Sequence, residues 1–295
     1  MTSNEKLIER IEGLPCWSGQ ISVEPLSGGI TNLNFVVTDG GTRYFLRSGA
    51  DIPVHGVMRF NELAAAKAAA QVGLSPDVVH HEPGLLVTEF IDGKTFAPED
   101  VREAGNLVPM VDLIRRCHRE MPHHMRGPVL MFWPFQVVRS YAGFLRDGQS
   151  RCLELLPDLL SKAVRLEEAV GPIKVVFGHN DLLAANFIDD GSRLWLIDWD
   201  YAGMNSPLFD LANLASNNEF DRDQESALLE TYFGGAIPPD VIAAFRAMAS
   251  ASLLRETMWS MVSELHSSLD FDFEAYTAEN MARFERAYSE FEGEA

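Results

Sequence analysis

The stretch that decides the fold reads His179-Asn180-Asp181-Leu182-Leu183-Ala184-Ala185-Asn186, and it is followed shortly by Leu196-Ile197-Asp198-Trp199-Asp200. Short β-like runs at 174–177 and 194–197 flank this polar loop, although the surrounding sequence is largely helical. The stretch contains an Asp, an Asn five residues later and a second Asp at the end of an apolar strand. We therefore expect Asp181, Asn186 and Asp198 to point at one centre.

These side chains have the chemistry that phosphoryl transfer requires, and their spacing is that of a kinase catalytic loop. An attacking hydroxyl needs a carboxylate that orients it and accepts its proton, and Asp181 fits that role. Magnesium prefers oxygen ligands, which Asp198 and the amide of Asn186 can supply. The alternative is a polar surface loop whose acids are there by chance. His179 fits a structural role, bracing the loop through hydrogen bonds, better than proton exchange.

A second signal lies near the start of the chain, where residues 26–32 read Leu-Ser-Gly-Gly-Ile-Thr-Asn between two predicted strands. Backbone amides that glycines leave accessible can approach a phosphate chain. Paired glycines between strands also occur in ordinary turns, which is the alternative. The candidate cofactor-binding residues of this loop are Ser27, Gly28, Gly29, Thr31 and Asn32.

Two charged residues follow this loop in the sequence, a basic one on a strand and then an acidic one on a helix. Arg47 lies on the next predicted strand, and Glu62 lies on the helix after it. A phosphate chain needs a cation that a carboxylate holds in place, and an arginine binds phosphate as a planar fork. The alternative is an unpaired strand arginine and a solvated helix acid. The order of glycine loop, basic strand residue, helix acid and D-x-x-x-x-N favours the functional interpretation.

Hydrophobic periodicity predicts how the elements are organised. Strands are expected at 21–26, 33–38, 42–47, 78–80 and 85–90, with one helix at 58–72. Further on, helices are expected at 108–119, 135–145, 153–170, 209–217, 240–266 and 273–291. We therefore predict an α+β fold of two lobes, a small β-rich nucleotide-binding lobe over residues 1–91 and a larger, mainly helical catalytic and substrate-binding lobe over 92–295.

Composition narrows the possible partners. The 24 Lys and Arg residues stand against 43 Asp and Glu, a formal net charge of −19. Nucleic acid and anionic membranes reward a basic protein face, so neither is the expected partner, whereas a small cation would be attracted. The three cysteines are far apart, which argues against a disulfide framework or a zinc site. No signal peptide or membrane-spanning run is visible, so we predict a cytoplasmic protein without membrane insertion.

Over nearly its whole length, the chain resembles the choline/ethanolamine kinase branch of the aminoglycoside-phosphotransferase-like, protein-kinase-like superfamily. The resemblance rests on the loops already described, on Arg47 and Glu62, and on the segment Phe209-Asp210-Leu211-Ala212-Asn213. It implies a two-lobed protein-kinase-like fold, Mg²⁺ as cofactor, and ATP bound at a hinge near Glu89 and Ile91.

The resemblance also suggests which residues bind the acceptor. Trp259, Phe271 and Tyr276 are similar to aromatics that enclose a trimethylammonium group, and Tyr201 matches another aromatic of that pocket. Aromatic faces hold a permanent cation well, and a nearby carboxylate such as Asp200 adds attraction. Core packing is the alternative for Trp259 and Tyr276. One departure stands out: Glu256 takes the place of a family tryptophan, which leaves room for an acceptor whose ammonium pairs with an acid.

These observations together predict an ATP- and Mg²⁺-dependent kinase that phosphorylates the hydroxyl of a small cationic alcohol, choline first. Ethanolamine, thiamine, an aminoglycoside or another small hydroxyl compound are alternative acceptors. A catalytically silent nucleotide-binding scaffold is the alternative from another class, and the intact set of Asp181, Asn186 and Asp198 argues against it. The sequence leaves the oligomeric state and the choice between ATP and GTP open.

Overall fold

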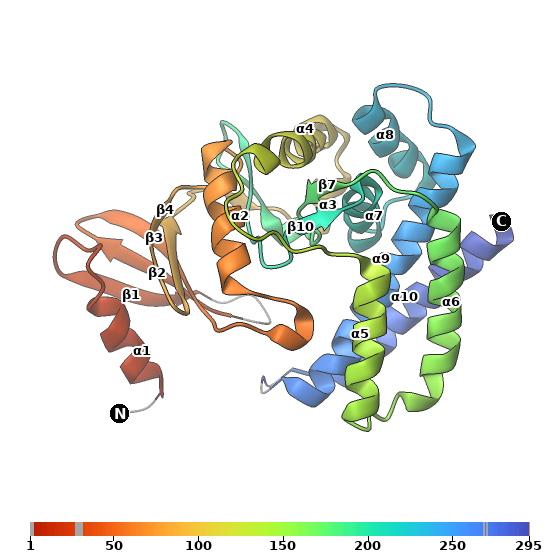
Figure 1. Cartoon of the computed structure of the whole chain (residues 1–295). Coiled ribbons are helices and arrows are strands. Elements are labelled where there is room, and N and C mark those ends of the chain that lie inside the picture. The colour runs from red at the N-terminus through yellow and green to blue at the C-terminus, as the bar shows by residue number, and fades with distance from the viewer. Residues whose placement is uncertain (1–2, 27–31, 268, 270, 295) are drawn as a thin grey trace.

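The computed structural model describes residues 3–26, 32–267, 269 and 271–294, and its N-terminal part is built on an antiparallel sheet (Figure 1). The strands lie in the order β1-β2-β3-β5-β4, and all neighbouring pairs are antiparallel. Their bounds are β1 (Ile21–Leu26), β2 (Leu33–Asp39), β3 (Thr42–Ser48), β4 (Val78–Glu82) and β5 (Leu85–Glu89). Helix α1 (Ser3–Glu12) precedes the sheet and packs against it.

Alternating apolar side chains give this sheet a buried face. The turn between β2 and β3 consists of Gly40 and Gly41, whose positive φ angles of 57° and 90° suit a tight two-residue hairpin. Side chains of α1 and of β2, β3 and β5 then meet in a small apolar core. Its buried members are Ile11, Leu14, Phe35, Val37, Leu46, Leu85 and Val87.

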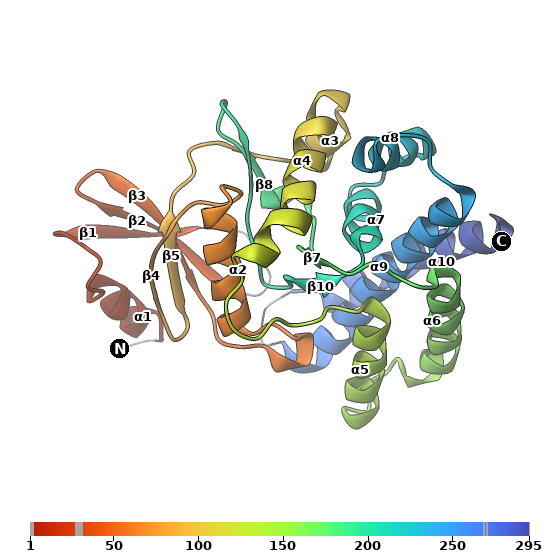
Figure 2. The ribbon, with the colours of Figure 1, turned by 45° about the horizontal axis from the view of Figure 1, so that its top comes forward.

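Helix α2 (Arg59–Gln71) lies between this sheet and the helical remainder of the chain, as both ribbon views show (Figure 2). Its run of alanines allows close packing, and Ala65 and Ala69 are completely buried in the main core. The helix ends before Gly73, whose φ of 67° is left-handed. Small side chains therefore let α2 connect the two parts tightly and hold its first turn at their junction.

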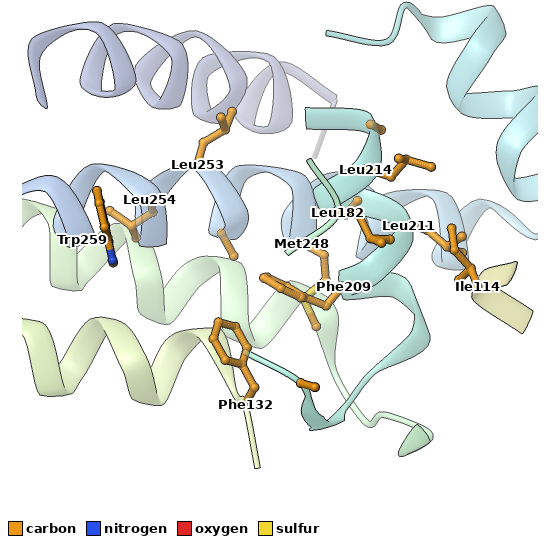
Figure 3. Packing of buried hydrophobic residues seen from close by; sticks show 14 of the residues in the cluster. Ile114, Phe132, Leu182, Phe209, Leu211, Leu214, Met248, Leu253, Leu254 and Trp259 are labelled. Carbon is orange, nitrogen blue, oxygen red and sulfur yellow. The ribbon is translucent and has the colours of Figure 1, made fainter. Parts of the chain in front are cut away.

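The C-terminal part is mainly helical, and α9 (Pro239–His266) runs through its centre. Helices α5, α6, α7 and α10 pack against α9, and Figure 3 shows Leu254 and Trp259 of α9 in the same packed layer as Phe132 and Phe209. The other helices are α3 (Pro98–Arg102), α4 (Ala104–Glu120), α5 (Pro134–Asp147), α6 (Leu156–Val170), α7 (Pro207–Asn217), α8 (Arg222–Phe233) and α10 (Phe273–Glu294).

Two small sheets interrupt the helices and carry the polar loops. Strand β7 (Val176–Gly178) pairs with β10 (Gly203–Asn205). Strand β8 (Phe187–Asp189) pairs with β6 (Lys94–Thr95) and with β9 (Leu194–Leu196). The loop from β7 to β8 contains Asp181 and Asn186, and the loop from β9 to β10 contains Asp198. The β pairing thereby brings two loops that lie apart in sequence to one place.

The predicted α+β, protein-kinase-like fold is confirmed. The predicted strands and the long helices match the structure to within a few residues at most ends, whereas α1, α3, α8 and the short β6, β8 and β10 were not predicted. Among the described residues, no helix is both long enough and apolar enough to span a bilayer. A division into lobes after Ile91 stays a prediction.

Candidate active site

The loop after β7 carries Asp181, and buried hydrogen bonds fix the backbone just before it. The Asp210 carboxylate accepts the N–H of His179 at 2.8 Å and the N–H of Asn180 at 2.7 Å. Asn180 has a positive φ of 66°, which asparagine tolerates better than most residues. The chain therefore turns sharply at Asn180 and presents Asp181 in one fixed direction.

Asp210 lies on α7 and is itself held by a buried chain of hydrogen bonds. The Nε2 atom of His118 is 2.9 Å from the Asp210 carboxylate, and its Nδ1 atom is 2.7 Å from the Tyr232 hydroxyl. Burial works to raise the pKa of Asp210, but the hydrogen bond and charge of His118 outweigh it and lower that pKa below its ordinary value. Asp210 is therefore an ionised anchor for the loop.

The ring of His179 lies beneath the same loop. Its Nδ1 accepts the N–H of Asp181 at 3.3 Å, and its Nε2 donates to the carbonyl of Ile197 at 2.9 Å. The ring also packs against Trp199, with centroids 4.7 Å apart. Burial lowers the pKa of His179, which suits a neutral ring protonated on Nε2. His179 thus braces the Asp181 loop against the segment that leads to Asp198.

Asp181 lies near a cation, the completely buried Arg255 of α9. Nη2 of Arg255 is 3.4 Å from the Asp181 carboxylate, and Nη1 is 3.0 Å from the carboxylate of Glu256. Burial raises the pKa of Asp181 to about 6, against the opposing effect of Arg255. A carboxylate with this pKa is ionised at neutral pH and is a better proton acceptor than an ordinary aspartate.

The two predicted metal ligands lie beside Asp181. Asn186 donates its Nδ2 hydrogen to the carbonyl of Asp181 at 2.8 Å, so the amide oxygen is the atom left to bind a cation. Asp198 adopts a left-handed φ of 69°. Desolvation by the surrounding protein, together with the negative charges of Asp200 and Asp181, raises the pKa of Asp198 well above its ordinary range.

The donor chemistry of this pair suits magnesium. Within the described residues, no group of three or more His, Cys, Asp or Glu side chains could hold a metal by itself. Magnesium in phosphoryl-transfer sites takes one or two protein oxygens and completes its octahedron with substrate phosphates and waters. The carboxylate of Asp198 and the amide oxygen of Asn186 fit that requirement, because excess negative charge already surrounds Asp198.

A buried ion pair connects the sheet to α2. Nη2 of Arg47 on β3 is 2.5 Å from the Glu62 carboxylate, and both side chains are almost fully buried. The Nε atom of Arg47 is buried without a hydrogen-bond partner. The predicted pairing of the strand arginine with the helix acid is therefore present, and Arg47 retains an unused donor.

A second arginine, which sequence reasoning missed, extends this pair to the C-terminal part. Nη1 of Arg59, the first residue of α2, is 3.0 Å from Glu62 and 2.6 Å from Asp200, and Nη2 donates to the side-chain oxygen of Asn32 at 2.6 Å. The Asn32 amide in turn donates to Asp200 at 3.2 Å. Asp200 therefore lies in an ion-pair network with Arg59, and Asn32 joins the residues after β1 to it. The other predicted loop residues, 27–31, lie outside the described part of the chain.

The predicted hinge residues line a hollow of about 330 Å³. Glu89 is exposed at the end of β5, and Ile91 follows it. Other lining residues come from the β8–β9 hairpin, including Asp190 and Trp195. The predicted catalytic acids are not among the residues that line this hollow.

The predicted aromatic residues lie close to one another, and one of them, Tyr201, lies next to Arg255. The guanidinium carbon of Arg255 is 5.3 Å from the Tyr201 ring centroid. The indole N–H of Trp259 donates to the Tyr201 hydroxyl at 3.0 Å, and the ring of Trp259 lies edge-on to that of Tyr276, with centroids 6.4 Å apart. Tyr276 also contacts Phe271 at 5.6 Å. Four aromatic rings from three segments therefore share one region.

Glu256 contributes an acid to the same region. Its carboxylate accepts the Tyr276 hydroxyl at 2.8 Å and pairs with Arg255. Burial and the charge of Glu256 raise the pKa of Tyr276, so the tyrosine stays protonated and donates. The departure from the family tryptophan thus places a negative charge against an aromatic cluster, close to Asp181.

Comparison with known proteins shows the family of this chain. The model of the phosphotransferase enzyme family matches residues 22–249, which include the glycine loop, the ion pair and both catalytic loops. The chain belongs to the phosphotransferase enzyme family. The predicted resemblance to that superfamily, and the prediction of an enzyme that transfers a phosphoryl group, are therefore confirmed.

Individual similar proteins point to the choline/ethanolamine kinase branch of this family. Protein LicA of Haemophilus influenzae is 26% identical over 210 residues, which cover 70% of this chain and 61% of LicA. A probable ethanolamine kinase of Arabidopsis thaliana is 25% identical over 287 residues, which cover 86% of this chain and 76% of the plant protein. The solved structure of a choline/ethanolamine kinase family protein from Mesorhizobium loti is 27% identical, with a TM-score of 0.79 and coverage of 99% and 98%.

Two arginines that contact the predicted site residues were not predicted, although each left a trace in the sequence. Arg59 stands three residues before Glu62, which is one helical turn. Arg255 directly precedes Glu256, a charged pair inside an otherwise apolar helix.

Proposed function

We propose that this phosphotransferase moves the terminal phosphoryl group of ATP to the hydroxyl of a small cationic alcohol, with choline as the first candidate. One observation carries the proposal: Arg255 pairs with the Asp181 carboxylate and lies over the ring of Tyr201. The catalytic carboxylate and the aromatic cluster are therefore neighbours across a single side chain. An acceptor of a few carbon atoms could reach both, with its hydroxyl at Asp181 and its cationic head group among the rings.

In this proposal Asp181 orients the acceptor hydroxyl and takes its proton as the oxygen attacks phosphorus. The rigid anchoring of the loop by Asp210 and His179 limits the motion of Asp181, and such positioning is the main protein contribution to phosphoryl transfer. Arg255 keeps Asp181 ionised before the reaction. The proton moves to Asp181 Oδ, and ADP leaves with the electron pair of the broken P–O bond.

Arg47 would bind the phosphate chain of ATP from β3, with Glu62 holding it in place and its unused Nε available as a further donor. Asp198 and the amide oxygen of Asn186 would hold Mg²⁺, which when bound neutralises charge on the β- and γ-phosphates. The named relatives support an alcohol acceptor, since they include a probable ethanolamine kinase. A cytoplasmic location stays a prediction.

The test is release of ADP from ATP and Mg²⁺ by the full chain, with choline, ethanolamine, thiamine and an aminoglycoside supplied separately. We expect turnover with choline well above the blank and no turnover in Asp181→Ala, which should keep the thermal stability of the wild type. Turnover only with thiamine or the aminoglycoside would discard the head-group proposal. Wild-type turnover in Asp181→Ala would refute the role of the carboxylate, and silence with all four acceptors would favour the scaffold alternative.

A second acceptor, ethanolamine, is favoured by a specific feature, the carboxylate of Glu256 beside Tyr276. A primary ammonium can donate hydrogen bonds to a carboxylate, whereas a trimethylammonium has no N–H to donate. Glu256→Gln should therefore raise the KM for ethanolamine more than the KM for choline. Trp259→Ala should do the opposite, because aromatic faces are the main partners of a quaternary cation.

A further inference from the structure

The connection between β3 and α2 reaches from the sheet across to the helical part (Figure 1). It contains a single 3₁₀ turn, Pro53–His55, closed by an antiparallel bridge between Ile52 and Val57. Gly56 follows with a φ of 74°, which a side chain would strain. The turn holds one side chain, His55, at a fixed place against α5 and α9.

His55 is 7% exposed, and both of its ring nitrogens have partners in the helical part. Nδ1 is 3.2 Å from the hydroxyl of Tyr141 on α5, and Nε2 is 3.1 Å from the hydroxyl of Ser263 on α9. The ring lies 5.2 Å from the Trp259 ring, with an interplanar angle of 33°. Two hydrogen bonds therefore set the orientation of a ring that packs directly on Trp259.

Trp259 has several other partners, and two of them, Tyr201 and Tyr276, belong to the proposed acceptor region. Its N–H bonds to Tyr201, and its ring meets Phe273 at 6.0 Å and Tyr276 at 6.4 Å. Within the described residues, His55 is the member of this ring cluster that comes from the N-terminal third of the chain. The position of Trp259 thus depends on a residue more than 200 positions away in sequence.

We propose that His55 is a positioning residue that sets the selectivity of the acceptor site, by fixing the indole of Trp259 from the sheet side of the molecule. This inference rests on the acceptor site proposed above. Among the described residues, the hydrogen bonds and the indole contact of His55 go to Tyr141, Ser263 and Trp259, so it acts through Trp259 and not on the reacting atoms.

The charge state of His55 agrees with this role. Burial, together with the nearby Arg255 and His266, lowers the pKa of His55 to about 3. The ring is therefore neutral under working conditions. A neutral ring supports the indole without repelling a cationic head group, which an imidazolium at the same place would do.

The experiment compares kcat, the KM for choline or ethanolamine and the KM for ATP in the wild type and in His55→Ala. Loss of the ring contact should raise the acceptor KM on the order of 10-fold while the KM for ATP stays unchanged. A purely structural role would lower the active fraction, and thus apparent kcat, without moving the acceptor KM. His55→Gln, which keeps hydrogen-bonding capacity, should recover part of the loss.

Three further variants keep the test decisive if His55→Ala does not fold. Tyr141→Phe and Ser263→Ala each remove one partner of His55 without touching Trp259, and both should raise the acceptor KM in the same direction. Thr257→Val is the matched control, because Thr257 is also buried on α9 and its hydroxyl donates to the carbonyl of Leu253, away from His55. Thr257→Val should leave the acceptor KM unchanged.

A double-mutant cycle adds a direct measure of coupling. The effects of His55→Ala and Trp259→Phe on acceptor KM should combine to less than their product. Unchanged acceptor KM in the His55, Tyr141 and Ser263 variants, with normal wild-type turnover, would overturn this inference alone. Absence of wild-type turnover with every amino alcohol would overturn the proposed function and this inference together.

Discussion

Acidification should destabilise this protein through His55 by an amount that the structure allows us to work out. The folded pKa of His55 is about 3, whereas the ordinary value of the unfolded residue is 6.5. As pH falls below 6.5, the unfolded chain binds a proton that the folded state refuses, so the free energy of unfolding decreases. The contribution of His55 is therefore fully present above pH 6.5 and is lost progressively between 6.5 and 3.

The size of this loss follows from the interval. Each pH unit between the two pKa values costs about 1.4 kcal/mol, so the wild type should lose about 2 kcal/mol on going from neutral pH to near pH 5. The side chain is almost entirely buried, so solvent screening does not reduce this figure much. A loss of that size is a considerable share of the total stability of an ordinary domain.

Urea unfolding of the wild type and of His55→Gln at the two pH values isolates this contribution. Other acids, including Asp181, titrate in both proteins and cancel in the comparison. Tyr141 and Ser263 remain as hydrogen-bonding partners, and Arg255 keeps its charge near the site. The wild type should lose about 2 kcal/mol more than His55→Gln. Equal losses, or an NMR titration of the His55 ring with a midpoint near 6.5, would refute the reasoning.

Three further predictions concern Asp198 of the predicted metal site, Gly49 beside Asn32 and Arg59, and Asp210, which anchors the Asp181 loop. Asp198→Asn should abolish Mg²⁺-dependent turnover. It should also stabilise the ligand-free protein by about 1 kcal/mol in thermal unfolding, because it removes a charge from a cluster of carboxylates. A variant less stable than the wild type would contradict this. Gly49→Ala should raise the KM for ATP on the order of 10-fold in steady-state assays, because the added Cβ would collide with Asn32 and lie 3.1 Å from Arg59. Gly143→Ala is the control and should leave this KM unchanged, because open space surrounds Gly143. Asp210→Asn should lower the free energy of unfolding in urea by roughly 3 kcal/mol and remove most of the turnover, because it leaves His118 and the loop N–H groups without their ionised acceptor. Wild-type stability together with wild-type turnover in this variant would show that the anchor is dispensable.

Local sequence rules were sufficient for much of the fold. Strand alternation and the Gly40-Gly41 turn predicted the β2–β3 hairpin, and apolar residues at helical spacing predicted α5, α7 and α9. Helix α8 escaped prediction, although Asp221 and Gln224 form a capping box at its start. The missed strands β8 and β10 are three residues long, too short for a period to be visible.

For the site, the sequence by itself determined the catalytic loops, because Asp181, Asn186 and Asp198 lie within 18 residues and a short β pairing is enough to bring them together. It also indicated the pairing of Arg47 with Glu62. Only the tertiary structure decided the rest. Arg59 meets Asp200 across 141 positions, and His55 meets Ser263 across 208. Such contacts depend on how whole elements pack, and a residue's own neighbours in sequence carry no record of the side chain it will meet.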